Sequence, residues 1–141
     1  MTVAHFTISY GCLLIAAILP ILCAWVAKTG LLGKAPLEGR FNNHDPRGFL
    51  AKQGGLSARA NAAQANSFEA LPFFIGAVLV AHQLGASEGA RACWLDGLSV
   101  AFIVLRVAYI AAYLADWASV RSRIWTLGFL VNIAILFVGY R

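Results

Sequence analysis

The chain has 141 residues, of which 60% are hydrophobic and only 12% are charged, and its mean hydropathy is +0.74. These values lie outside the range of soluble globular domains, because too few polar residues remain to cover a water-exposed surface. The formal charge of +5 does not indicate a nucleic acid partner, since no basic stretch is interleaved with aromatic residues. The sequence therefore predicts an integral membrane protein with a single domain, residues 1–141.

Four segments satisfy the length of about 20 mainly apolar residues that a transmembrane helix needs. They cover about residues 6–27, 57–84, 92–115 and 122–140. The first has neither the basic start nor the cleavage site of a signal peptide, so we expect it to stay in the membrane. Ser57 is the expected N-cap of the second helix. The predicted fold class is an all-α bundle of four transmembrane helices.

The connections differ in their basic charge. Residues 28–52 hold five of the eleven Lys and Arg residues, and we expect them to form a loop with a turn at 43–46. The second connection carries only Arg91, whereas the third carries Arg121 and Arg123. By the positive-inside rule, the first and third connections face the cytoplasm and both termini face the other side. The bacterial inner membrane is the expected location.

The cysteines and histidines give no sign of redox or metal chemistry. Cys12 and Cys23 lie in an apolar helix, where cysteine usually serves as a small hydrophobic residue. No C-x-x-C spacing is present, and the three histidines are scattered without an H-x-x-x-H pair. We expect no metal site.

Polar residues occur on one face of the second helix, before the uncharged apolar run that starts at Ala70. Arg59 and Asn66 lie about 20° apart around a helix axis, and Glu69 lies within about 80° of Arg59. Ionisable residues within spans are costly and usually face a bundle interior or a water-filled cavity. This stripe is therefore a candidate functional site.

A second stripe occupies the third helix at spacings of three and seven residues, with Arg106, Tyr109 and Tyr113. Because the two helices run in opposite directions, both stripes lie toward the same membrane surface. One interpretation is structural, with Glu69 and Arg106 pairing to join two helices, a contact worth about 0.6–2 kcal/mol. The other is a polar ligand site. Arginines suit carboxylates and Glu69 suits an ammonium group, so the ligand would be zwitterionic with net negative charge.

The residues of both stripes resemble the MAPEG superfamily, the membrane-associated proteins in eicosanoid and glutathione metabolism. The second helix is similar to the family signature in Arg59-Ala60, Asn66, Glu69 and Pro72-Phe73, and the third in the segment RVAYIAAYL, residues 106–114. The four spans, the basic first connection and the arginines of the third extend the likeness over the whole chain.

This resemblance implies a homotrimer that binds glutathione as cosubstrate near the cytoplasmic surface, between neighbouring subunits. It implies that Arg121 or Arg123 stabilises the glutathione thiolate and that Tyr113 donates a hydrogen bond to sulfur or product. The residues that would hold or support glutathione are Arg59, Asn66, Glu69, Arg106, Tyr109 and Tyr113. The lipophilic small-molecule substrate would arrive from the bilayer.

The chain departs from the family pattern at three positions. Many members have an arginine where this chain has Ala62, and histidines where it has Gln64 and Tyr109. Each lost charged hydrogen bond would weaken the hold on glutathione by about 1.5–3 kcal/mol. The leading interpretation is a glutathione-dependent membrane transferase or peroxidase acting on lipophilic electrophiles. The alternative is a non-catalytic trimeric membrane protein of the same fold that binds a lipid or a partner protein.

Overall fold

The computed structural model describes residues 6–33, 37–86 and 88–140, and all of its regular secondary structure is helical. Four long helices are α1 (Ile8–Thr29), α3 (Gly55–Gln83), α4 (Gly89–Leu114) and α5 (Ala118–Phe137). Each is long and apolar enough to cross a membrane. The predicted all-α fold with four spans is confirmed, and the chain is a multi-pass membrane protein.

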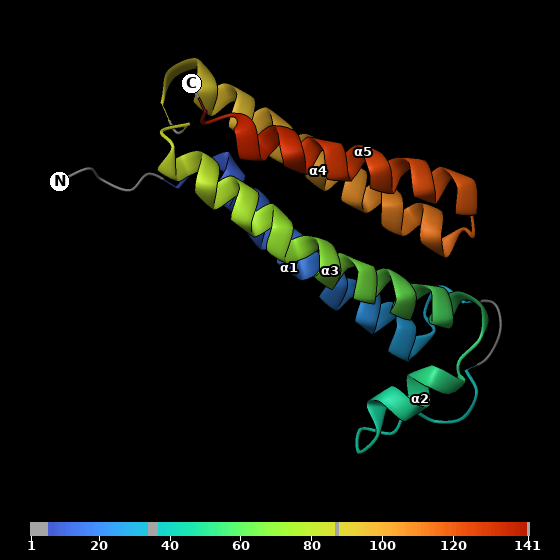
Figure 1. Ribbon diagram of the computed structural model, residues 1–141. Coiled ribbons are helices and arrows are strands. Elements are labelled where there is room, and N and C mark those ends of the chain that lie inside the picture. The colour runs from blue at the N-terminus through green and yellow to red at the C-terminus, as the bar shows by residue number, and fades with distance from the viewer. Residues whose placement is uncertain (1–5, 34–36, 87, 141) are drawn as a thin grey trace.

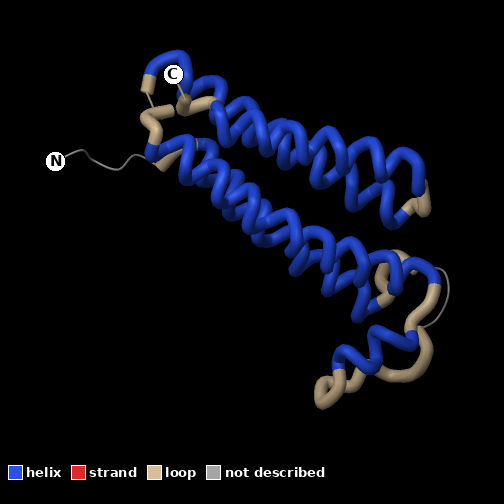
Figure 2. Tube along the Cα trace, viewed as in Figure 1, coloured by secondary structure: helices blue, strands red, loops and turns tan. Residues whose placement is uncertain are grey.

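The four long helices are arranged as two antiparallel pairs, α1 with α3 and α4 with α5 (Figure 1). The start of α1 and the end of α5 lie at one end of the bundle (Figure 1). The first connection and the turn between α4 and α5 lie at the other (Figures 1 and 2). The first connection and the start of α5, which hold most of the basic residues, therefore share one end of the molecule.

The first connection contains a short helix that the sequence prediction of a loop did not include. This helix, α2, spans Pro46–Lys52, with Asp45 as its N-cap accepting a hydrogen bond from the Gly48 amide. Proline at the first helical position and an aspartate cap favour helix initiation there. The predicted turn occurs directly before it, at 43–44.

The predicted N-cap of the second span is wrong. Gly54 occupies the N-cap of α3, and no side chain caps it. Ser57 lies inside the first turn, buried, and its hydroxyl donates to the Ala27 carbonyl oxygen near the end of α1. The serine therefore joins two helices.

The turn between α4 and α5 is tighter than predicted, and α5 begins at Ala118, earlier than the expected residue 122. Asp116 adopts a left-handed conformation (φ 63°), and the Trp117 amide donates to the Ala112 carbonyl oxygen at 2.9 Å. This is the Schellman pattern that ends many helices. As a result, Arg121 and Arg123 belong to the first turns of α5.

Small residues and aromatic rings form the buried core of the bundle. Phe74 on α3 stacks on Phe102 on α4, with ring centroids 4.1 Å apart. Alanines let helices approach closely, which favours packing between transmembrane helices. The buried cluster that contains this stack also includes Cys12, Ala16, Ala77, Val78, Ala81, Ala86, Leu95 and Ile135.

A polar cluster joins α1, α3 and α4 at the end of the bundle where α1 begins. The Ser9 amide donates to Asp96 Oδ1 at 2.9 Å, and the Ser9 hydroxyl lies 2.9 Å from His82 Nε2. Tyr10 stacks on the His82 ring, with centroids 4.4 Å apart. First-turn amides of a helix have no acceptor within the helix, so Asp96 supplies one from a neighbouring helix.

Replacing Asp96 by alanine is expected to lower the free energy of unfolding by about 1–2 kcal/mol, because the Ser9 amide loses a charged acceptor. Asp96→Asn keeps an acceptor oxygen in place and is expected to cost less. The midpoint of thermal unfolding in detergent compares the two variants with the wild type. An alanine variant as stable as the wild type would show that this bond contributes nothing.

Candidate functional site

The guanidinium group of Arg106 lies between α4 and α3 and is almost fully buried, with 5% of the residue exposed. Both of its terminal nitrogens donate to Asn66 Oδ1 at 3.3 Å, and Nη2 also donates to Ser67 Oγ at 3.1 Å. The structure therefore brings together one member of each predicted stripe. It adds Ser67, which follows Asn66 directly and was not predicted.

Glu69 is linked to the Arg106 guanidinium indirectly, because Asn66 bonds to both residues. Asn66 Nδ2 donates to Glu69 Oε2 at 3.4 Å, and Glu69 itself is exposed. The direct ion pair between Glu69 and Arg106 that the structural interpretation requires is not formed. Within the described residues, the one ion pair lies elsewhere, between Arg59 and Asp116. The buried Arg106 thus has neutral hydrogen-bond acceptors but no carboxylate partner in the described part of the chain.

Two tyrosines continue the site from Arg106 toward α5. The Arg106 guanidinium lies 4.5 Å from the Tyr109 ring centroid, and Tyr109 meets Tyr113 edge to face with centroids 5.6 Å apart. The Arg121 guanidinium lies over Tyr113 at 4.2 Å. Such cation–aromatic contacts contribute about 0.5–2 kcal/mol each. We refer to Asn66, Glu69, Arg106, Tyr109, Tyr113 and Arg121 as the Arg106 cluster.

The tight turn after α4 explains why Arg121 reaches this cluster. Because α5 starts only four residues after Leu114, its first turn packs back beside the last turn of α4. Arg123 is exposed and makes no hydrogen bond or ion pair within the described residues. The two arginines, two positions apart on a helix, point in directions that differ by about 160°.

Arg59 does not join the cluster, although it shares a helix face with Asn66. Its Nε donates to the Leu114 carbonyl oxygen at 3.1 Å, and Nη1 lies 3.9 Å from Asp116 Oδ2. Arg59 is seven residues nearer the start of α3 than Asn66, about 10 Å along the helix. It therefore interacts with the end of α4.

An open cavity of about 310 Å³ adjoins the Arg106 cluster between α3, α4 and α5. It presents a guanidinium, a phenol, an amide and two hydroxyls, which are groups that bind anionic and peptide-like ligands. The indole of Trp125 supplies an apolar wall. The lining residues are Asn66, Tyr109, Arg121, Ser122, Trp125 and Thr126.

Asn132 on α5 is a further polar residue that the sequence analysis missed. It is buried, with 2% exposed, and its Oδ1 has no hydrogen-bond partner within the described residues. It lines a narrow cavity of about 50 Å³ together with Arg106 and Tyr109. The available signal was its position as the single amide in the apolar run 124–140.

A comparison with protein families bears on the identity of the chain. The MAPEG family model matches residues 8–140, which is nearly the whole chain. Searches of curated proteins and of solved structures gave no match. The matched range includes all four long helices and every residue of the Arg106 cluster. The chain therefore belongs to the MAPEG family, whose members are membrane proteins of eicosanoid and glutathione metabolism.

Proposed function

We propose that the protein is a glutathione-dependent membrane transferase or peroxidase that acts on lipophilic electrophiles. The buried guanidinium of Arg106, which lacks a carboxylate partner within the described residues, carries this proposal. A buried charge is normally paired, because removal from water costs several kcal/mol. A carboxylate of a bound ligand supplies the missing counter-charge.

Glutathione fits the charges of this site. It carries two carboxylates and one ammonium group, which correspond to the cations Arg106 and Arg121 and to the exposed carboxylate of Glu69. Asn66 holds both charged side chains in place. Its amide oxygen accepts a hydrogen bond from the Arg106 guanidinium, and its amide nitrogen donates one to the Glu69 carboxylate. The family membership supports the same proposal, since the MAPEG family is generally associated with glutathione.

The proposed chemistry is attack by the glutathione thiolate on an electrophile, which either adds the sulfur and then takes a proton or expels a leaving group. With a hydroperoxide the O–O bond breaks, an alcohol leaves, and a second glutathione reduces the resulting sulfenic acid to give glutathione disulfide and water. Arg121 is the residue we assign to lowering the thiol pKa, because a neighbouring cation favours the thiolate form. Its position over Tyr113 keeps the guanidinium at the cavity. Tyr113 donates a hydrogen bond to the sulfur or to the product. The apolar wall at Trp125 suits a substrate that enters from the bilayer.

Two further features belong to this proposal. The active form is a homotrimer in which a neighbouring subunit closes the open side of the cavity. The first and third connections face the cytoplasm, where glutathione is available, as the seven-to-one asymmetry of basic residues indicates. Ala62 and Gln64, where many members have cations, favour the non-catalytic alternative, in which the same fold binds a lipid or a partner protein.

Glu69→Gln is expected to weaken glutathione binding by about tenfold, because the ligand ammonium group loses an opposite charge at an exposed site. Size and packing change little, so the oligomeric state should be retained. Titration calorimetry with glutathione and size-exclusion chromatography measure the two properties. Glu88→Gln, an exposed carboxylate at the other end of the bundle, is the matched control. Dissociation of the oligomer with unchanged binding would show that Glu69 only joins helices.

A further inference from the structure

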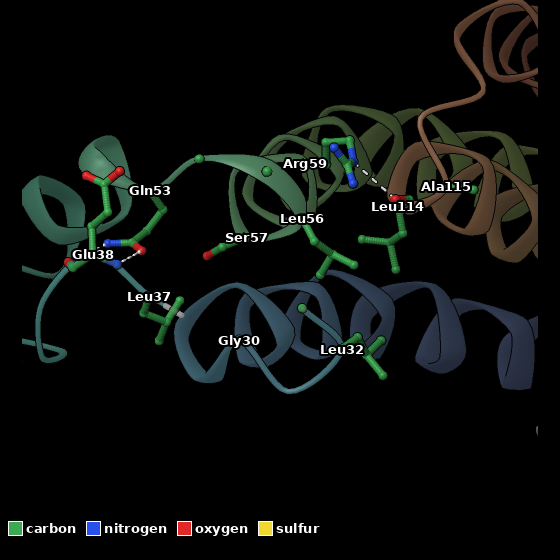
Figure 3. Close-up of a pocket in the computed structure, with 13 residues that line it drawn as sticks. Gly30, Leu32, Leu37, Glu38, Gln53, Leu56, Ser57, Arg59, Leu114 and Ala115 are labelled. Atoms are coloured by element: carbon green, nitrogen blue, oxygen red, sulfur yellow. Dashed lines mark hydrogen bonds between the residues drawn. The ribbon is translucent and has the colours of Figure 1, made fainter. Parts of the chain in front are cut away.

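A second and larger cavity lies apart from the Arg106 cluster, at the end of the bundle that carries the first connection. Its volume is about 560 Å³, within the range of sites that hold small molecules. The end of α1, the start of α3 and the end of α4 surround it. Figure 3 shows Arg59 and Leu114 at one end of this cavity, with Glu38 and Gln53 at the other.

Most of the side-chain wall of this cavity is apolar. Leu32, Leu37, Leu56 and Leu114 face it from three separate segments of the chain (Figure 3). Gln53 is occupied elsewhere, because its amide exchanges hydrogen bonds with the Glu38 backbone at 2.9 and 3.1 Å. Figure 3 places Leu32, Leu56 and Leu114 toward the Arg59 end and Leu37 toward the Glu38 end, so hydrocarbon suits the Arg59 end of this cavity.

Arg59 is the only cation that lines the cavity among the described residues. One of its five N–H groups donates to the Leu114 carbonyl oxygen. Its ion pair with Asp116 is long, at 3.9 Å, and the Asp116 side chain is 69% exposed, so this pair is weak. The guanidinium thus retains donors for an additional anion.

The first turn of α3 supplies more donors close to Arg59. Gly54, the N-cap, provides no side-chain cap, and the cavity wall includes Gly55, Leu56 and Ser57 of the first turn. The amides of a first helical turn have no acceptor within the helix and favour phosphate groups. Cβ atoms at Gly54 and Gly55 would meet no atom within 4 Å, so the space before them is open.

The depth of the cavity in the membrane indicates that its ligand is a lipid. It lies where α1 ends and α3 begins, the level at which lipid phosphates occur in a bilayer. We propose that this cavity binds the headgroup region of one anionic phospholipid, with the phosphate at Arg59 and the first turn of α3 and the acyl chains leaving the cavity along Leu32, Leu56 and Leu114. The carboxylate of Glu38 at the opposite end keeps the anion at the Arg59 end.

Native mass spectrometry of the detergent-purified protein tests this site, with dioleoylphosphatidylglycerol as the anionic probe and dioleoylphosphatidylcholine as the zwitterionic one. The wild type is expected to bind the anionic lipid at least tenfold more tightly. Arg59→Gln should lose about tenfold in affinity for it, because a charged hydrogen bond is removed. Arg47→Gln removes an equal charge from exposed α2, away from the cavity, and should leave the affinity unchanged.

Leu56→Trp provides a second variant that keeps Arg59 but fills the cavity, and it should also abolish binding of the anionic lipid. Equal affinity for the two lipids, or equal losses in Arg59→Gln and Arg47→Gln, would overturn the proposal, because the cavity would not then recognise the phosphate charge. Displacement of the lipid by added glutathione would also overturn it, since the cavity would then belong to the glutathione site.

Discussion

Replacing Arg121 by alanine is expected to raise the pKa of the bound glutathione thiol by about 1–3 pH units, the usual effect of losing a nearby opposite charge. A higher pKa leaves less thiolate at neutral pH, so the rate there should fall, by up to about tenfold for each pH unit by which the pKa rises above the assay pH. The pH–rate profile should move toward alkaline pH by the same amount. Arg121 is suited to this role because it lies over Tyr113 and lines the cavity.

Arg123→Ala is the matched control, since it removes the same charge from the same helical turn but from an exposed position. It is expected to leave the thiol pKa unchanged. Stopped-flow ultraviolet absorbance of the thiolate at several pH values measures both variants. An unchanged pKa in Arg121→Ala and Arg123→Ala alike would reject arginine activation and favour the non-catalytic alternative.

Arg106→Met is expected to reduce glutathione affinity by about a hundredfold, because the buried counter-charge for a ligand carboxylate is lost. The stability of the ligand-free protein should change by no more than about 1 kcal/mol. The loss of the hydrogen bonds to Asn66 and Ser67 is offset by removal of a buried charge that has no described carboxylate partner.

Thermal unfolding with and without glutathione separates the two interpretations of Arg106. The wild type should gain stability when glutathione is added, because a ligand that binds only the folded state stabilises it. Arg106→Met should show no such gain in stability. Arg106→Lys keeps the positive charge but loses the planar guanidinium that binds a carboxylate with two hydrogen bonds, so it should show part of the gain. A large loss of stability with unchanged glutathione affinity would instead establish Arg106 as a residue that joins α3 and α4.

The four spans were predictable because hydrophobicity over about 20 residues is a direct requirement of the bilayer. The sequence also placed the two polar stripes at one level of neighbouring antiparallel helices, by helical periodicity and the short second connection. The pair that it suggested across them, Glu69 with Arg106, is not formed, and Arg106 donates to Asn66 instead. The role of Ser67 was not predicted, because a lone serine within an apolar helix usually donates to the backbone carbonyl oxygen four residues earlier. Ser67 also makes that bond here, to Ala63.

The separation of Arg59 from the cluster could not be predicted from helical angles alone. An arginine side chain is long, and the carbonyl oxygen that it reaches, on Leu114, is exposed by the helix end that Asp116 creates. That turn is unexpected because an aspartate replaces the usual glycine in the left-handed position. The same turn starts α5 early, and the charged residues 121–123 gave no signal of a helix start there.

Titration of the purified protein with glutathione, followed by the ultraviolet absorbance of the thiolate, tests the central claim most directly. The account predicts a saturable thiolate signal at neutral pH, where the thiol group of free glutathione is mainly protonated. The signal should be lost in Arg106→Met and moved to higher pH in Arg121→Ala. Absence of any saturable thiolate signal in the wild-type protein would contradict the assignment of the Arg106 cluster as a glutathione site.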